Sequence, residues 1–109
     1  MTKIYLKKDS VIGYNEISVS GHSGYSDEGS DIVCAAASVL VLNTINAVES
    51  FTEDTFQYEE DEEKGLIDFR ILSDMTPETE LLLKTLMLGL SGIQEEYGTK
   101  YIRFQAKEV

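Results

Sequence analysis

Two residues that could carry out covalent chemistry occur once each in this sequence, His22 and Cys34. They lie in the stretch GHSGYSDEGSDIVCAAAS, which runs from Gly21 to Ser38. An imidazole beside a thiol can accept its proton and later return that proton to a leaving amine. These two side chains therefore supply the parts needed for acyl transfer through a thioester, provided that the fold brings them together.

The local pattern predicts where Cys34 lies. Residues Ile32 to Ser50 read as a helix, which Ser30 or Asp31 can cap with a side-chain oxygen. Cys34 would then lie in the first turn, where the helix dipole and the unbonded N–H groups favour a thiolate. The same N–H groups, including that of Cys34, could form part of an oxyanion hole.

From the residues alone, other interpretations stay open. A lone cysteine in an alanine-rich helix is commonly a small buried hydrophobe, and a histidine before glycine is commonly a turn residue. A metal site built from His22, Asp31 and Cys34 would have three ligands of mixed type, and the sequence has no second histidine.

The elements that must position these residues follow from hydrophobic periodicity. Alternation predicts strands and turn residues divide them, whereas broad apolar stripes predict helices. The expected elements are strands at 2–8 and 14–21, a helix at 32–50, a hairpin over 54–72, a helix from Thr76 to Tyr97, and a strand at 99–107. The tip of the hairpin, from Glu59 to the turn residue Gly65, is nearly all acidic. Thr76 is the expected N-cap of the second helix, Pro77 its first residue and Gly98 its C-terminal stop.

This order, ββαββαβ, predicts one α+β domain over residues 1–109. We expect a mostly antiparallel sheet with two long helices, layered α/β/α. The first helix is apolar nearly all round, which is typical of a buried helix. Gly89 and Gly92 each lower helix stability by about 1 kcal/mol relative to Ala, so they indicate a tight helix contact, within the chain or across a dimer.

Composition narrows the class of partner and compartment. The formal net charge is −11, which disfavours direct binding to nucleic acid and would attract a basic partner, although solubility alone could explain it. The single cysteine excludes an internal disulfide and favours a reducing, intracellular setting. We find no targeting segment, and the apolar run near 32–42 is too short to span a bilayer, so we expect a cytoplasmic protein.

The stretch from Gly21 to Ser38 resembles the signature of the bacterial ribosomal-processing cysteine protease family (Prp). The matching residues are Gly21, His22, Gly24, Tyr25, Gly29, Asp31, Ile32, Val33, Cys34, Ala35, Ala36 and Ser38. Ser23 stands where the family commonly has alanine, and the side chain is still small. The length and the element order also agree, so the resemblance covers essentially the whole chain.

The resemblance implies a homodimeric cysteine endopeptidase that uses neither cofactor nor metal. Its nucleophile would be Cys34 and its general base His22. The implied substrate is the N-terminal extension of large-subunit ribosomal protein twenty-seven, cut after a pair of aromatic residues. Removal of that extension is required for ribosome maturation.

The other motif residues have two interpretations each. Asp31 is either a helix N-cap, which we favour, or an orienter of His22; Ser38 either bonds in the pocket or back to the helix. Tyr25 would form a pocket wall or anchor a loop, in which Gly21, Gly24 and Gly29 are hinge points.

Two rival functions are a thiol redox sensor or transferase, which lacks a resolving thiol here, and a non-catalytic ribosome-assembly factor that holds a basic partner. Cleavage of a peptide containing an aromatic pair, blocked by a thiol alkylator, would separate all three.

Overall fold

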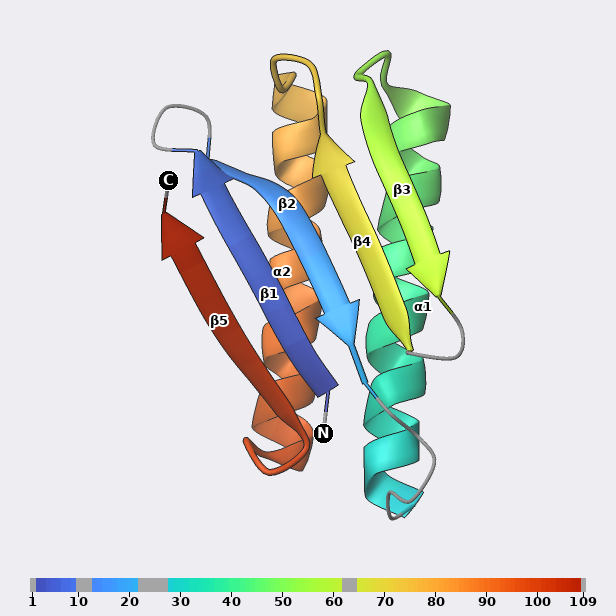
Figure 1. The fold of residues 1–109 in the computed structure, drawn as a ribbon, viewed down its shortest axis with the longest axis vertical. Coiled ribbons are helices and arrows are strands. Elements are labelled where there is room, and N and C mark those ends of the chain that lie inside the picture. The colour runs from blue at the N-terminus through green and yellow to red at the C-terminus, as the bar shows by residue number, and fades with distance from the viewer. Residues whose placement is uncertain (1, 10–12, 22–27, 62–64, 109) are drawn as a thin grey trace.

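The computed structural model describes residues 2–9, 13–21, 28–61 and 65–108 of the chain (Figure 1). Its elements follow the order ββαββαβ that the sequence predicts. They are β1 (Thr2–Asp9), β2 (Gly13–Ser20), α1 (Glu28–Phe51), β3 (Phe56–Asp61), β4 (Leu66–Ile71), α2 (Pro77–Tyr97) and β5 (Ile102–Glu108).

The strands form one sheet in the order β3-β4-β2-β1-β5. Three neighbouring pairs, β1–β2, β2–β4 and β3–β4, are antiparallel, and β1 pairs with β5 in parallel. The prediction of an α+β fold with a mostly antiparallel sheet is therefore confirmed. β2 stands at the centre of the sheet, so its C-terminal end delivers the chain to Gly21 between flanking strands.

The prediction of three α/β/α layers is wrong, because both helices lie behind the same face of the sheet in Figure 1. Cross-strand pairs such as Ile4↔Val19 and Ile17↔Phe69 are buried on this face, whereas Tyr5, which points to the other face, is 49% exposed. α1 and α2 also contact each other along their lengths. The fold therefore has two layers, and the second face of the sheet is open.

The core lies between the sheet and the helix pair. Strand residues Ile4, Val19 and Phe69 meet helix residues such as Val41 and Leu90 there, all of them nearly inaccessible to solvent. At about 25 cal/mol per Å² of buried apolar surface, such residues provide the main favourable term in folding.

The prediction that α1 is buried all round is only partly correct. Val33, Ala37 and Val41 are fully buried, but Ile32 and Val39 on the opposite side are exposed. The reason is the two-layer arrangement, in which one side of each helix faces away from the sheet. The prediction that the apolar run in this helix is too short to span a bilayer is wrong by length and composition, because the segment Ile32–Phe51 is long and apolar enough. Core helices of globular proteins can have the same length and composition. The buried side of this segment contacts the sheet and α2, as a core helix does.

Helix α1 begins at Glu28, ahead of the predicted start at Ile32. Ser30 and Asp31 therefore belong to its first turn, and the prediction that either of them is the N-cap is wrong. The caps of α2 agree with prediction: the Thr76 side chain accepts a hydrogen bond from the Thr79 N–H, Pro77 begins the helix, and Gly98 follows it with φ 95°.

The two glycines of α2 have different surroundings. A Cβ added to Gly89 would lie 3.0 Å from Leu40 Cδ1, so Gly89 is the place where α2 approaches α1 closely. Gly92 is exposed and has nothing within 4 Å of that position. The expected tight helix contact within the chain is thus confirmed for Gly89 and does not involve Gly92.

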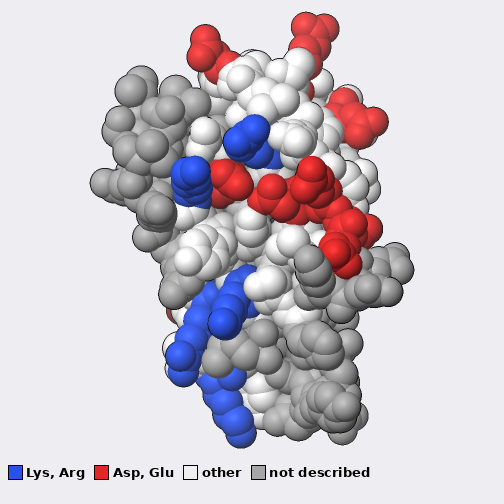
Figure 2. Space-filling model, in the orientation of Figure 1, with Lys and Arg blue, Asp and Glu red and all other residues white. Residues whose placement is uncertain are grey.

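The open face of the sheet carries charged side chains of both signs. Figure 2 views this face, with basic side chains at the lower left and, in the upper half, beside acidic ones, and with further acidic side chains at the top and on the right. Pairing places Lys3 beside Arg103 on β1 and β5, and Glu59 beside Asp68 on β3 and β4. The β3–β4 side of the molecule is therefore the acidic one.

Candidate active site

The only cysteine of the chain, Cys34, lies in α1 as a free, partly buried thiol. Because α1 begins at Glu28, Cys34 falls in the second turn rather than the predicted first turn. Only the N–H groups of the first helical turn lack an acceptor within the helix, and the effect of the dipole fades beyond that turn. The predictions that Cys34 lies in the first turn and that its N–H belongs to an oxyanion hole are therefore wrong.

The backbone at the end of β2 lies directly against the sulfur of Cys34. A Cβ added to Gly21 would be 2.9 Å from Cys34 Sγ and 3.3 Å from Thr2 Oγ1. Gly21 is buried, and Thr2 is 1% exposed. Glycine is required at 21 because any side chain would enter the space that the thiol occupies, so this residue packs against the sulfur.

A second glycine holds Gly21 in place. The Gly21 N–H donates to the Gly65 carbonyl at 3.0 Å, just before β4 begins. Gly65 has φ 62°, and a Cβ there would lie 1.7 Å from the Gly21 carbonyl oxygen. Both the positive φ and the close approach exclude other residues at 65. The β3–β4 hairpin thus fixes the end of β2 beside the thiol.

Cys34 opens into a cavity of about 80 Å³ between the second turn of α1 and the acidic ends of β3 and β4. The side chain of Ser38, one turn further along α1, lines the same cavity, as do Leu66 and Ile67 of β4. Glu60 and Asp61, at the end of β3, line it as well. The thiol therefore faces a small hollow lined by apolar residues and by two acidic residues at the end of β3.

The predicted site residues divide into those that the structure brings together and those that it does not describe. Gly21, Cys34 and Ser38 lie at one place. The prediction that Gly21 is a hinge point is wrong, because it is buried against the sulfur and its φ is not positive. His22, Gly24 and Tyr25 lie outside the described residues. Gly29 and Asp31 belong to the backbone of the first turn of α1, and their side-chain environment also lies outside the description.

Sequence reasoning missed Gly65, Glu60 and Thr2 as neighbours of the thiol. Gly65 was predicted only as a turn residue, because its turn is visible locally and its contact with Gly21 is not. Glu60 was assigned to the hairpin tip, whereas β3 continues to Asp61 and places both residues at the cavity.

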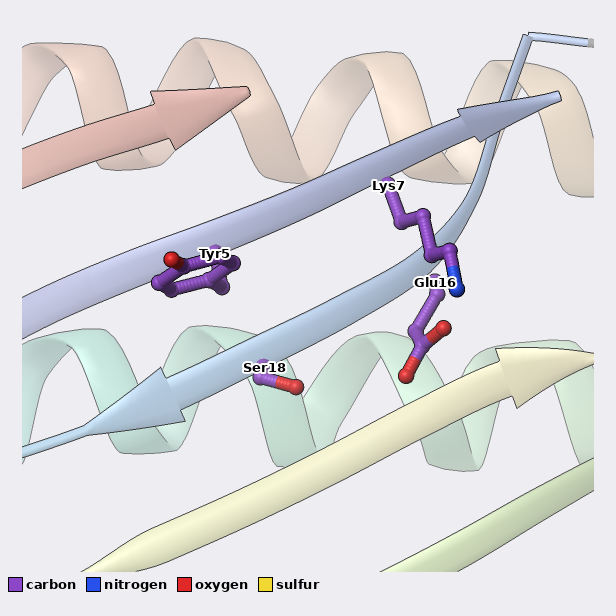
Figure 3. Close-up of a pocket in the computed structure, with 4 residues that line it drawn as sticks. All are labelled: Tyr5, Lys7, Glu16 and Ser18. Carbon is purple, nitrogen blue, oxygen red and sulfur yellow. The ribbon is translucent and has the colours of Figure 1, made fainter. Parts of the chain in front are cut away.

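A larger hollow of about 200 Å³ lies on the open face of the sheet, lined by Tyr5, Lys7, Glu16 and Ser18 (Figure 3). Ser18 donates a short hydrogen bond to the Asp68 carboxylate. The hollow lies across the sheet from α1, and among the residues that the structure describes, those that line it include no cysteine or histidine. Its larger volume therefore does not make it the candidate active site, which remains the smaller cavity at Cys34.

Within the described ranges, histidine, cysteine and carboxylate side chains form no cluster of three or more that is suited to a metal ion. The arrangement around Cys34 is instead one of a thiol, a glycine backbone and a cavity. Such a site suits nucleophilic chemistry on a substrate that can reach the sulfur.

A family model described as cysteine protease Prp matches residues 1–103. The chain belongs to the cysteine protease Prp family. A curated relative, the ribosomal processing cysteine protease Prp of Staphylococcus aureus (strain Mu50), is 30% identical over 82 residues, which cover 75% of this chain and 77% of the relative.

Solved structures of Prp from S. aureus share the fold. One, in complex with a substrate peptide, is 27% identical with a TM-score of 0.89 over 98% of this chain and all of that one. Another, with a covalently linked product peptide, has a TM-score of 0.85 at the same identity and coverage. This family is one of cysteine proteases, so the site at Cys34 is a candidate peptidase site.

Proposed function

We propose that this protein is a cysteine endopeptidase that uses Cys34 as its nucleophile and His22 as its general base. Its proposed substrate is large-subunit ribosomal protein twenty-seven, from which it removes the N-terminal extension after an aromatic pair. The names of the relatives, which are ribosomal processing proteases, support a ribosomal protein as substrate. The relative with a covalently linked product peptide supports a covalent route.

The single observation that carries the proposed dyad is the contact of Gly21 with the sulfur. Gly21 packs against Cys34 Sγ, and His22 is the next residue in the sequence. Consecutive Cα atoms are about 3.8 Å apart, so the imidazole is joined to the backbone one residue from the thiol contact. The fold therefore brings the residue next to His22 in the sequence into contact with the thiol.

The proposed reaction has two halves. His22 accepts the proton of the Cys34 thiol as the sulfur attacks the scissile carbonyl, and a tetrahedral intermediate forms. The C–N bond then breaks, His22 donates the proton to the departing amine, and a thioester remains on Cys34. Water, deprotonated by His22, attacks this thioester; the C–S bond breaks, the acid product leaves, and the thiol regains its proton.

The molecular context of the reaction is part of the proposal. We infer a cytoplasmic homodimer that acts without a cofactor or metal and does not bind nucleic acid directly. The charge of −11 supports a basic protein substrate rather than a polyanion. Asp31, which lies inside α1, and Ser38, which lines the cavity, remain candidates for positioning the dyad or the substrate.

The test uses the extended ribosomal protein as substrate and mass spectrometry of its N-terminal fragments. The wild-type protein should release the extension after the aromatic pair, and pretreatment with a thiol alkylator should abolish release. His22→Ala should lower the rate by about 10²–10⁴-fold, since a general base typically contributes that much. Release by alkylated protein at the untreated rate would refute the proposal.

A further inference from the structure

One edge of the sheet, β3, ends at the cavity that contains Cys34. β3 stands last in the sheet order and pairs with β4 on its inner side. Its residues Gln57 to Glu60 are exposed, and its last two residues, Glu60 and Asp61, line the cavity. An edge strand turns half of its backbone N–H and C=O groups away from the sheet, where an extended peptide can bond to them.

We propose that β3 binds the substrate chain as an added strand, so that an extended basic segment runs along this edge and reaches the thiol. The inference rests on the proposed peptidase function and deepens it by assigning the substrate-docking surface. The chemistry recognised is an unfolded peptide segment that carries lysine or arginine. Affinity comes from the main-chain bonds and selectivity from side chains that alternate along the strand.

The charge along β3 fits such a segment. Gln57, Glu59 and Asp61 share the open face, because they pair with Arg70, Asp68 and Leu66 there. Glu59 and Asp61 are two residues apart, which places them about 6–7 Å from each other along a strand. Basic side chains two residues apart on an added strand would match this spacing.

The other row of β3 residues faces the helix layer. Phe56 and Tyr58 pair with Ile71 and Phe69, and the rings of Phe56 and Phe69 have centroids 5.3 Å apart. Tyr58 donates a hydrogen bond to Glu60 at 3.0 Å. The intervening side chains of an added strand would therefore meet an aromatic surface that leads to the cavity.

A cross-strand pair indicates that Glu59 does not serve stability. Glu59 pairs directly with Asp68, and like charges placed opposite each other destabilise a sheet. The Asp68 carboxylate accepts a hydrogen bond from the Ser18 hydroxyl of β2, on the side away from Glu59. Replacing Glu59 with a neutral residue should thus stabilise the fold while weakening attraction for a basic peptide.

The opposite edge of the sheet is a built-in control. β5 pairs with β1 and carries Arg103 and Lys107 in its sequence. It lies on the far side of the sheet from β3, and none of its residues lines the Cys34 cavity in the described part. A basic peptide that selects an edge by charge and by access to the thiol should avoid β5.

The first experiment measures amide hydrogen exchange by NMR in the Cys34→Ala protein. The probe is a synthetic peptide with an aromatic pair and, on each side of it, two lysines separated by one residue; its uncharged twin has glutamine for lysine. We expect the outward amides of β3 to gain at least 10-fold protection with the basic peptide and less with the twin, and the amides of β5 to be unchanged. Exchange in β3 that does not respond to either peptide would overturn the proposal.

The second experiment measures kcat/KM on the same peptides. Glu59→Lys should lower the value for the basic peptide by about 10-fold at low salt and lower it much less for the twin, because only the basic peptide loses an attraction between opposite charges. Glu95→Lys, at an exposed position on α2, is the matched control and should affect neither peptide. Single N-methylation along the peptide should reduce cleavage at alternate positions; equal sensitivity at all positions would contradict strand addition.

These readouts separate the two proposals. The exchange experiment detects binding and does not need cleavage. Docking at β3 can therefore be refuted while the peptidase proposal stands, and the peptidase proposal can be refuted while docking stands. Protection of β3 that rises with protein concentration in the absence of peptide would show that a second copy of the chain covers this edge, and would also overturn docking of the substrate there.

Discussion

The contact between Gly21 and Cys34 predicts the effect of adding one methyl group at position 21. Gly21→Ala should lower kcat/KM by about 10–100-fold, because displacing a catalytic group by about 1 Å can have an effect of this size. The added Cβ would stand 2.9 Å from Sγ, closer than such atoms pack. The measurement is peptide cleavage, together with the thermal midpoint of unfolding.

A double substitution controls for general damage at this position. Gly21→Ala should destabilise the wild-type protein more than it destabilises the Cys34→Ala protein, in which the sulfur is absent. Equal destabilisation in both backgrounds would mean that the contact with the sulfur is not what makes glycine necessary at 21.

At this scale, the sequence predicts the reacting group and part of its surroundings. Cys34 is identified by its uniqueness and by the motif, and Gly21 by its place in that motif. Gly65 cannot be identified as a site residue from its turn, because its contact with the Gly21 carbonyl joins residues that are distant in the sequence. Periodicity and turn rules are local, so they identify the glycine without its partner.

At the scale of elements, the end of α1 is tied to the start of α2 by one carboxylate. Asp54 Oδ2 accepts hydrogen bonds from the backbone N–H and the side-chain hydroxyl of Thr76, both at 2.9 Å. Burial raises the pKa of Asp54, but hydrogen bonds from Thr79 and Thr76 outweigh it and hold the pKa below its ordinary value of 3.8. The folded state thus favours the charged form.

Asp54→Ala should lower the free energy of unfolding by about 1–3 kcal/mol at neutral pH, as expected when hydrogen bonds to a charged group are lost. A lowered folded-state pKa stabilises the fold above the unfolded-state value, and this contribution is lost as the pH falls through the folded-state pKa. The difference between the two proteins in urea unfolding should therefore shrink on acidification below 3.8. A difference that is constant with pH would refute this role; Glu53→Ala, at an exposed neighbour, is the control.

The glycines of α2 allow a paired prediction. Gly92→Ala should raise the free energy of unfolding by about 1 kcal/mol, because alanine favours the helix more than glycine does. Nothing lies within 4 Å of the new methyl group. Gly89→Ala should raise the free energy of unfolding by less, or lower it, because Leu40 would have to move by a few tenths of an ångström. Urea unfolding of both variants measures the difference; an equal gain for both would contradict the close approach of the helices at Gly89.

The elements themselves were largely predictable, with one instructive exception. Alternation identified the strands, and Thr76, Pro77 and Gly98 fixed the ends of α2. The start of α1 was misplaced because Glu28 to Asp31 has no apolar residue, includes a glycine and ends in residues that favour caps. That first turn therefore carries no hydrophobic periodicity from which a helix could be recognised.

For the whole molecule, charge predicts how association depends on salt. With a net charge of −11 and an acidic β3–β4 side, association with the full ribosomal protein should slow as salt rises. Cleavage of a short neutral peptide should change little over the same range. Stopped-flow binding and peptide kinetics measure the two, and equal salt dependence would assign the acidic surface to solubility alone.

The layering of the whole molecule was the part that the sequence predicted least well. An apolar α1 suggested a helix buried on all sides and hence three layers, yet Ile32 and Val39 are exposed and both helices share one face of the sheet. Hydrophobicity shows which residues can be buried, whereas the number of layers depends on which side of the sheet each crossover takes. That choice is made by tertiary packing and leaves no periodic pattern.

The most direct test of the central claim is N-terminal fragment mass spectrometry of the extended ribosomal protein incubated with Cys34→Ala beside the wild type. The wild-type protein should release the extension after the aromatic pair. Cys34→Ala should release none and retain its fold, because alanine is the better helix former. Release by Cys34→Ala at a rate comparable to the wild type would show that Cys34 is not the nucleophile.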